Sequence, residues 1–293
     1  MTPPAVRRRN LPEPPWWGHP RPCPAAPAGL TCIQPNPGYE SVYRYVHRET
    51  CRAASEKERR PAGVSPKQEL SAAAYRSLRE LIISGRLSPG TALIEADLAG
   101  RLGMSRTPVR SAVQRLQQDG FAVPARVGKV LRAVVSPLTA EDMRDVFMMI
   151  GSLEGIAARL AAAMDPAARR ALVERMKRLN VDLRGASTAR PPDVKRAHDL
   201  DVALHRSYVE AAASPRLRSA LDALQPQAER YQRAYTTVLV YSFEPALREH
   251  LKIIAAIAAG DGEAAERHVG ENWRNGFRRY LREVTILGER GSW

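Results

Sequence analysis

The sequence lacks a long apolar segment and is poor in cysteine. Of its 293 residues 44% are apolar, but no uninterrupted apolar run approaches the roughly 18 residues of a membrane-spanning helix. Its three cysteines, Cys23, Cys32 and Cys51, are spaced neither as a disulfide framework nor as a zinc site. We therefore expect a cytoplasmic protein without a membrane partner.

The motifs of common enzymes are also missing. The sequence contains no His-Glu-x-x-His motif, no Gly-x-Ser-x-Gly elbow and no Walker loop. Strand patterns are absent after residue 138. These absences predict that the protein is not an enzyme and that its C-terminal half is entirely helical.

The sequence of residues 1–67 lacks the patterns that are typical of a folded domain. They hold 13 of the 23 prolines and show no apolar period, which predicts a disordered, Pro-rich extension. The basic start is not followed by an apolar h-region, so it does not resemble a secretory signal. After Met1 the next methionine is Met104. We therefore expect that translation begins near Val64 and that part of the extension is a start-site artefact.

Positive charge is concentrated toward the N-terminal side of the chain. The net charge of +14 divides into +6 for residues 1–67 (11 basic, 5 acidic) and +5 for residues 68–136 (10 basic, 5 acidic). Residues 137–293 carry only +3 (24 basic, 21 acidic). A compact basic domain joined to a nearly neutral one is typical of a polyanion-binding domain attached to a regulatory domain.

Residues 93–120 carry the pattern of two helices around a tight turn. The first helix ends at Gly103, Ser105 is placed to cap the second, and Pro108 lies in the first turn, where a missing N–H has no cost. Apolar residues recur on one side of the second helix, and a different face presents Arg106, Arg110 and Gln114. This is the layout of a helix-turn-helix with an exposed recognition helix, although a plain helical hairpin would show a similar pattern.

The next residues, 121–135, predict a β-hairpin. Val123, Ala125 and Val127 alternate along one side of the first strand, and the chain turns at 126–129. Gly128 and Lys129 give the tip a basic charge without bulk, which suits close approach to phosphates. We expect this hairpin to be the wing of a winged helix-turn-helix.

The block resembles the winged helix of the GntR family of bacterial transcription regulators. The resemblance is carried by the run 105–110 (Ser-Arg-Thr-Pro-Val-Arg), by Gln-Arg-Leu at 114–116, by Asp-Gly at 119–120 and by the Pro-Gly entry at 89–90. It implies a winged helix-turn-helix domain over 68–136. The residues expected to contact DNA are Ser105, Arg106, Thr107, Arg110, Gln114, Gly128 and Lys129.

Residues 137–288 predict an antiparallel bundle of helices, followed by a tail at 289–293. Thr139, with Asp142 three residues later, is placed as a capping box for the first helix. The bundle's motifs resemble the FCD ligand-binding domain of the FadR-like branch of GntR regulators: 152–161 (Ser-Leu-Glu-Gly-Ile-Ala-Ala-Arg-Leu-Ala), Asp201–His205, Ser214–Leu217, Glu249–His250 and Gly260–Asp261. The resemblance implies a mainly α protein whose bundle dimerises and binds a small organic acid, often beside a metal.

Asp201 and His205 are one helical turn apart, so their side chains can reach one point. The family's metal ligands map onto Asp201, His205 and His250, a set that suits one divalent ion such as Zn²⁺, Ni²⁺ or Mn²⁺. The alternative is a polar core patch without metal, in which the aspartate and the histidines hydrogen-bond one another.

Two positions depart from the family's pattern. Its fourth ligand, a histidine, falls on Asn272, and His268 one turn earlier is a possible substitute. The family commonly has an arginine where Ile150 stands, a residue able to clamp a carboxylate. Arg230 and Arg233 are the alternative partners that we expect for an acid effector.

The function expected from these observations is sequence-specific transcription regulation, most simply repression, modulated by a small carboxylic acid. A homodimer would bind an inverted-repeat operator in double-stranded DNA. Two other functions are compatible with the sequence. One is a metal-dependent hydrolase that uses Asp201, His205 and His250, and the other is a structural, nucleoid-type DNA-binding protein.

Overall fold

The computed structural model describes residues 21–22, 31–32, 65–239 and 243–291. Two short strands, β1 (Arg21–Pro22) and β2 (Thr31–Cys32), form an antiparallel pair. The predicted disorder of residues 1–67 and the predicted start near Val64 concern positions that lie largely outside the described residues, so both stay predictions. Pro66–Trp293 forms a separate compact unit that contains the remaining elements.

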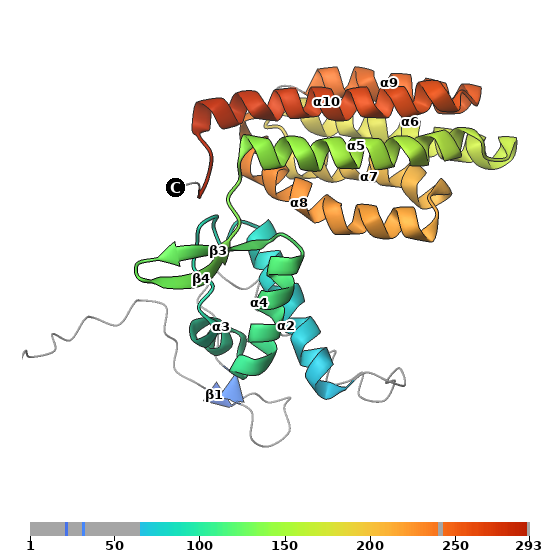
Figure 1. The fold of residues 1–293 in the computed structure, drawn as a ribbon. Coiled ribbons are helices and arrows are strands. Elements are labelled where there is room, and N and C mark those ends of the chain that lie inside the picture. Colours follow the sequence, from blue (N-terminus) through green and yellow to red (C-terminus); the bar gives the residue numbers. More distant parts are fainter. Residues whose placement is uncertain (1–20, 23–30, 33–64, 240–242, 292–293) are drawn as a thin grey trace, which may run out of the picture. The chain divides into compact units, whose positions relative to one another are not determined.

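The first part of this unit is a winged helix-turn-helix (Figure 1). Three helices, α2 (Pro66–Ile83), α3 (Glu95–Leu102) and α4 (Arg106–Gln118), are followed by the strands β3 (Ala122–Val127) and β4 (Val130–Val135). Their apolar faces meet in one core cluster, so the helical periodicity read from the sequence is confirmed. Fully or almost fully buried members are Leu78, Leu98, Val109, Val113, Leu116 and Phe121.

The turn between α3 and α4 forms as the sequence predicts, except for one cap. Gly103 ends α3 with φ of 63°, in the left-handed region that favours glycine. Ser105 occupies the N-cap position of α4 with an extended backbone, but its side chain makes no capping hydrogen bond. Ser105 is exposed to solvent.

The hairpin forms with the predicted turn, but its apolar side chains are distributed differently. Val127 pairs with Val130 across Gly128, which has φ of 65°. The expected alternation through Val127 is wrong, because Val127 is 42% exposed whereas Ala122 and Ala125 are buried. Only the base of the hairpin packs on the helices, so the tip projects beyond the core and its apolar residues stay accessible.

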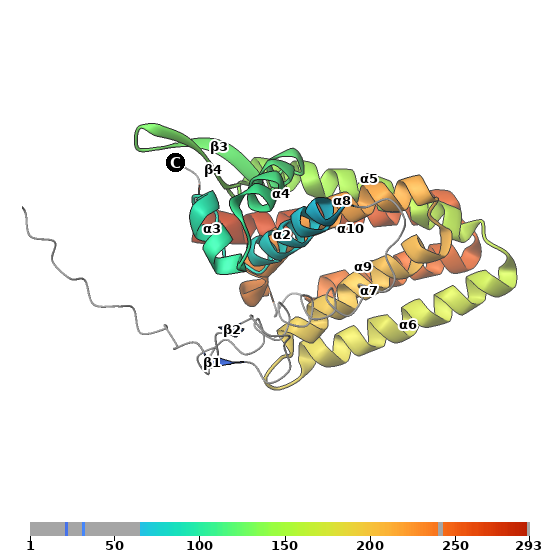
Figure 2. The same ribbon diagram turned by 90° about the horizontal axis from the view of Figure 1, so that it is seen from below.

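From residue 137 on, the described residues form six helices arranged as an all-α bundle (Figure 2). Helix α10 packs along α5 over most of its length, and α6 packs against α7 and α9. The core contains Phe147, Met176, Tyr208, Tyr231 and Ile253, all fully or almost fully buried. The helices are α5 (Ala140–Ala162), α6 (Pro166–Thr188), α7 (Val194–Ala212), α8 (Pro215–Leu239), α9 (Phe243–Ala259) and α10 (Gly262–Leu287).

Helix starts in the bundle follow their sequence signals. Thr139 accepts a hydrogen bond from the backbone N–H of Asp142, as predicted for a cap. The Asp142 carboxylate accepts from the hydroxyl of Tyr231, and that hydroxyl also accepts from the backbone N–H of Thr139. The capping box is therefore closed through a tyrosine of α8. Asp165 and Asp261 cap α6 and α10.

The close packing of α5 on α10 requires a glycine at position 151. A Cβ placed on Gly151 would lie 2.8 Å from the Cβ of Trp273, so one helix must move to admit it. We expect Gly151→Ala to lower the free energy of unfolding by about 1–3 kcal/mol, the usual cost of overpacking a well-filled core. Urea unfolding of the full chain, followed by circular dichroism, measures this change.

Gly185 provides the matched control for this substitution. It also lies inside a helix, α6, but a Cβ there meets nothing within 4 Å. Gly185→Ala should raise stability by up to about 1 kcal/mol, because alanine has the higher helix propensity. Equal stability changes in the two variants would show that α5 and α10 are not closely packed at Trp273.

Candidate functional site

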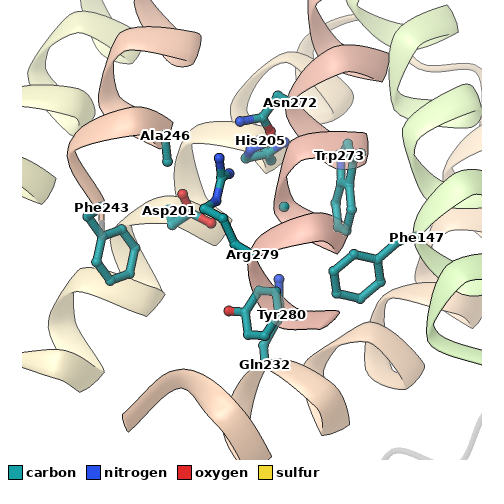
Figure 3. Close-up of a pocket in the computed structure, with 11 residues that line it drawn as sticks. Phe147, Asp201, His205, Gln232, Phe243, Ala246, Asn272, Trp273, Arg279 and Tyr280 are labelled. Atoms are coloured by element: carbon teal, nitrogen blue, oxygen red, sulfur yellow. The ribbon is translucent and has the colours of Figure 1, made fainter. Parts of the chain in front are cut away.

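A small cavity lies inside the helical bundle, with a volume of about 70 Å³. By the usual requirement of roughly 10–15 Å³ for one water, this is room for several waters or a small molecule. Figure 3 shows Asp201, His205, Asn272 and Arg279 converging on this region. Five helices contribute the lining residues: Phe147, Asp201, His205, Gln232, Phe243, Ala246, Asn272, Trp273, Gly276, Arg279 and Tyr280.

The three predicted metal ligands come together at this cavity. Asp201 and His205 lie on α7, and His250 reaches them from α9. One ligand atom from each residue lies within 4.8 Å of the other two. The Nε2 of His250 is 3.4 Å from the Oδ1 of Asp201, and His250 is completely buried.

Hydrogen bonds around the two imidazoles fix which nitrogen is available. Asn180 donates its amide N–H to the carbonyl of Leu247, so its Oδ1 faces the Nδ1 of His250, 3.1 Å away, and must accept. The Nδ1 of His205 lies 2.7 Å from a carboxylate oxygen of Glu154. Each histidine therefore holds a proton on Nδ1, which leaves Nε2 as the nitrogen available to a metal, as in metal-binding histidines.

The charge state of His250 suits a ligand. Burial, with smaller contributions from His205 and Arg279, lowers the pKa of His250 to about 4. The imidazole is therefore neutral near pH 7. Its Nε2 is buried and has no hydrogen-bond partner within the described part of the chain, which is a costly state for a polar atom unless something coordinates it.

The environment of His205 is balanced differently. Burial lowers its pKa, but the charge of Glu154 and the hydrogen bond to it outweigh that effect, so the pKa is raised. The carboxylate of Glu154 thus holds the Nδ1 proton firmly in place.

Glu154 was not singled out by the sequence analysis, although it is central to the site. It lies on α5, is 3% exposed and accepts hydrogen bonds from Tyr208 Oη at 2.8 Å and Trp273 Nε1 at 2.7 Å, besides that of His205. A glutamate on the otherwise apolar face of α5, inside Leu-Glu-Gly-Ile, was the available signal. Its partners come from α7 and α10, which the sequence does not place beside it.

Loss of this carboxylate should weaken metal binding through His205. We expect Glu154→Gln to lower zinc affinity by roughly 10–100-fold, the usual effect of removing the hydrogen-bonding partner of a metal ligand. Competition with a zinc-binding dye measures it. Glu266→Gln, which removes an exposed carboxylate paired with Arg159, is the control; equal affinities for both variants would contradict the role of Glu154.

Asn272 occupies the position at which the family has its fourth metal ligand. Asn272 lines the cavity and donates its Nδ2 N–H to Glu249 at 2.8 Å, so its Oδ1 is the atom left to face a ligand. His268 does not line the cavity. It interacts instead with Glu271 at 3.1 Å on its own helix.

Two arginines predicted to meet an effector lie elsewhere. Arg230 is buried and donates to the backbone carbonyl of Ser136, just after β4. Arg233 is exposed and pairs with Glu229 one turn away on α8. Neither arginine is among the residues that line this cavity. The reason is helical phase: of this stretch of α8, Gln232 faces the cavity.

The predicted DNA-contacting residues form a surface on the winged helix. Ser105, Arg106, Thr107, Arg110 and Gln114 are all exposed at the start and along one side of α4, opposite its buried apolar face. Gly128 and Lys129 are exposed at the hairpin tip. The surface is thus basic, accessible and carried by the elements that dock on DNA in winged helices.

The guanidinium of Arg110 has a partner that the sequence did not reveal. Its Nε lies 3.1 Å from a carboxylate oxygen of Glu95 at the start of α3, and the two side chains are 66% and 35% exposed. Such exposed pairs contribute about 0–1 kcal/mol, so Arg110 can exchange this partner for DNA at little cost.

The fold and the two sites define a winged-helix DNA-binding protein with a helical ligand-binding domain. Residues 70–128 match the profile described as "Bacterial regulatory proteins, gntR family", and residues 145–275 match the profile "FCD domain". The chain belongs to the GntR family of transcription regulators, with an FCD C-terminal domain. This family consists of transcription regulators and not of enzymes. The hypothesis of a metal-dependent hydrolase is therefore not supported.

Relatives agree with this assignment. The chain is 31% identical to a protein named "Probable D-xylose utilization operon transcriptional repressor" from Paenarthrobacter nicotinovorans, over 63% of this chain and 77% of that protein. It is 36% identical to an uncharacterized HTH-type transcriptional regulator of Agrobacterium vitis, over 32% of this chain and only 53% of the relative. Among solved structures, Escherichia coli McbR/YncC has the same fold, with a TM-score of 0.57, 20% identity, and coverage of 76% of this chain and all of that one.

None of the helices within the described ranges is long and apolar enough to cross a membrane.

Proposed function

We propose that the protein is a transcriptional repressor whose operator affinity depends on a divalent metal and a small carboxylic acid bound in the helical bundle. The observation that carries this proposal is the Asp201, His205 and His250 cluster. Its ligand atoms lie within 4.8 Å of one another, and the buried Nε2 of His250 has no partner among the described residues.

The donor set fits a divalent transition metal. One carboxylate and two imidazoles suit Zn²⁺, Ni²⁺ or Mn²⁺, and Asn272 offers an amide oxygen as a weaker fourth donor. When bound, the ion would supply a positive charge that attracts an acid. The polar-core alternative is less favoured, because within the described residues the two histidines hydrogen-bond Glu154 and Asn180 and not one another, and the buried Nε2 of His250 has no hydrogen-bond partner.

DNA recognition is assigned to α4 and the hairpin. Arg106, Thr107 and Arg110 would contact base edges and phosphates in the major groove, while Gly128 and Lys129 approach the backbone. We propose that the protein acts as a homodimer on a short inverted repeat, because two-fold protein symmetry is matched by a palindromic site.

Helix α8 offers a physical route between the two functions. Gln232 lines the cavity, and two residues of the preceding turns bind the winged helix: Arg230 donates to Ser136 O, and Gln227 donates to Asp119 O at the end of α4. A ligand that displaces α8 would therefore change the contacts that hold the recognition helix.

The test is footprinting of the purified protein on the promoter region of its own gene, at physiological salt and with competitor DNA. Protection of an inverted repeat that changes on adding metal and a member of a panel of carboxylic acids is the expected result. Uniform, salt-sensitive coating of all sequences would instead identify a nucleoid-type binder and overturn the proposal.

A further inference from the structure

One basic side chain, that of Arg279, lines the cavity and has no role in the predicted metal cluster. Of the described residues that line it, Arg279 is the one with a permanent positive charge. It lies on α10, seven residues after Asn272 and therefore on the same helical face. Its side chain is only 20% exposed, so the guanidinium is largely removed from solvent.

Arg279 is held in place by Glu249 of α9. The Nη1 and Nη2 atoms donate to the two carboxylate oxygens at 3.0 and 3.2 Å. The same carboxylate accepts from the amides of Asn272 at 2.8 Å and Asn275 at 3.0 Å. Four hydrogen bonds on a carboxylate that is itself 16% exposed fix the guanidinium before any ligand arrives.

This pairing leaves part of the guanidinium unused. A guanidinium has five N–H donors, and the contact with Glu249 takes one from each terminal nitrogen. The edge formed by Nε–H and a second terminal N–H has the geometry to hold a planar carboxylate by two parallel hydrogen bonds.

Among the described residues, no other lysine or arginine lines the cavity. Ile150, where the family commonly has an arginine, is 0% exposed in the apolar core. Arg230 is committed to Ser136 and Arg233 to Glu229. The sequence has thus lost one clamp position and carries a cation at another, on a different helix.

We propose that Arg279 is the group that clamps the carboxylate of the effector, with Glu249, Asn272 and Asn275 as its positioning residues. This inference rests on the proposed effector pocket and names the group that recognises the ligand. Glu249 already neutralises Arg279, and Asp201 adds a further negative charge, so the protein alone does not make the cavity positive. A divalent ion on the metal cluster reverses that balance, so carboxylate binding should require the metal.

Calorimetric titration of the full chain tests the proposal, with acetate as the probe and acetamide, its neutral analogue of similar shape, as the control ligand. Both are titrated into zinc-loaded and chelator-treated protein. The variants are Arg279→Gln, Arg279→Lys, which keeps the charge opposite Glu249, and Arg282→Gln, which removes an exposed arginine from the same helix. Zinc binding and melting temperature are measured for each.

We expect zinc-loaded wild type and Arg282→Gln to bind acetate and not acetamide. Arg279→Gln should bind acetate roughly 10-fold more weakly or worse, and Arg279→Lys should show an intermediate loss, because an ammonium cannot form the two-point contact. Zinc affinity should not fall in either variant. Acetate affinity unchanged in Arg279→Lys and Arg279→Gln, with zinc bound normally, overturns the clamp but leaves the proposed function standing. Failure of wild type to bind zinc overturns the proposed metal site instead.

Discussion

Replacing His250 with alanine is expected to abolish tight zinc binding and the response to an acid effector, while operator affinity measured without metal and effector stays unchanged. His250 is the one ligand that comes from α9, and its buried Nε2 has no other partner among the described residues. Removing it leaves a two-residue site on α7, so zinc affinity should fall by more than the roughly 10–100-fold that loss of a ligand's hydrogen-bonding partner costs. Dye competition for zinc and footprinting with and without effector measure the two effects.

Two further variants sharpen this prediction. Asn272→His restores an imidazole at the fourth position and should tighten zinc binding, because imidazole is a better donor to Zn²⁺ than an amide oxygen. His268→Ala should have no effect, since His268 interacts with Glu271 away from the cavity. Wild-type protein purified without chelator that holds no metal, together with a normal effector response in His250→Ala, would favour the polar-core alternative.

The second large effect is expected at the recognition helix. Arg110→Ala should weaken binding to the operator by about 1–3 kcal/mol and relax specificity at one base pair, if the guanidinium contacts a guanine edge by two hydrogen bonds. Its exposed pair with Glu95 does not hold it back, because such pairs contribute little. Affinities for operators substituted one base pair at a time measure the change.

Lys129→Ala should behave differently, because a residue at the wing tip meets phosphates. We expect it to weaken all sequences alike and to reduce the slope of log affinity against log salt by about 1. Arg178→Gln, an exposed arginine of α6, removes the same charge far along the chain from α4 and is the control. Sequence-independent losses of equal size in Arg110→Ala and Lys129→Ala would argue against the assignment of base contacts.

Much of the fold was determined by local sequence. The helix ends follow from Gly103, Thr139, Asp165 and Asp261, because left-handed backbone and N-capping side chains act within a few residues. The winged helix and the bundle could be predicted for the same reason, since their apolar faces repeat at helical spacing. The one-turn separation of Asp201 and His205 likewise placed two ligands together without any knowledge of packing.

Only the tertiary structure decided which side chains of other helices contact the residues of the site. Glu154 meets His205 across 51 residues, and Glu249 meets Arg279 across 30. No periodicity along the chain encodes these contacts, because they depend on how α5, α7, α9 and α10 pack. The same holds for Arg230, whose helical phase turns it to Ser136 and away from the cavity. The sequence alone determined which elements form and which residue types are present, whereas long-range packing determined which of those residues face the pocket.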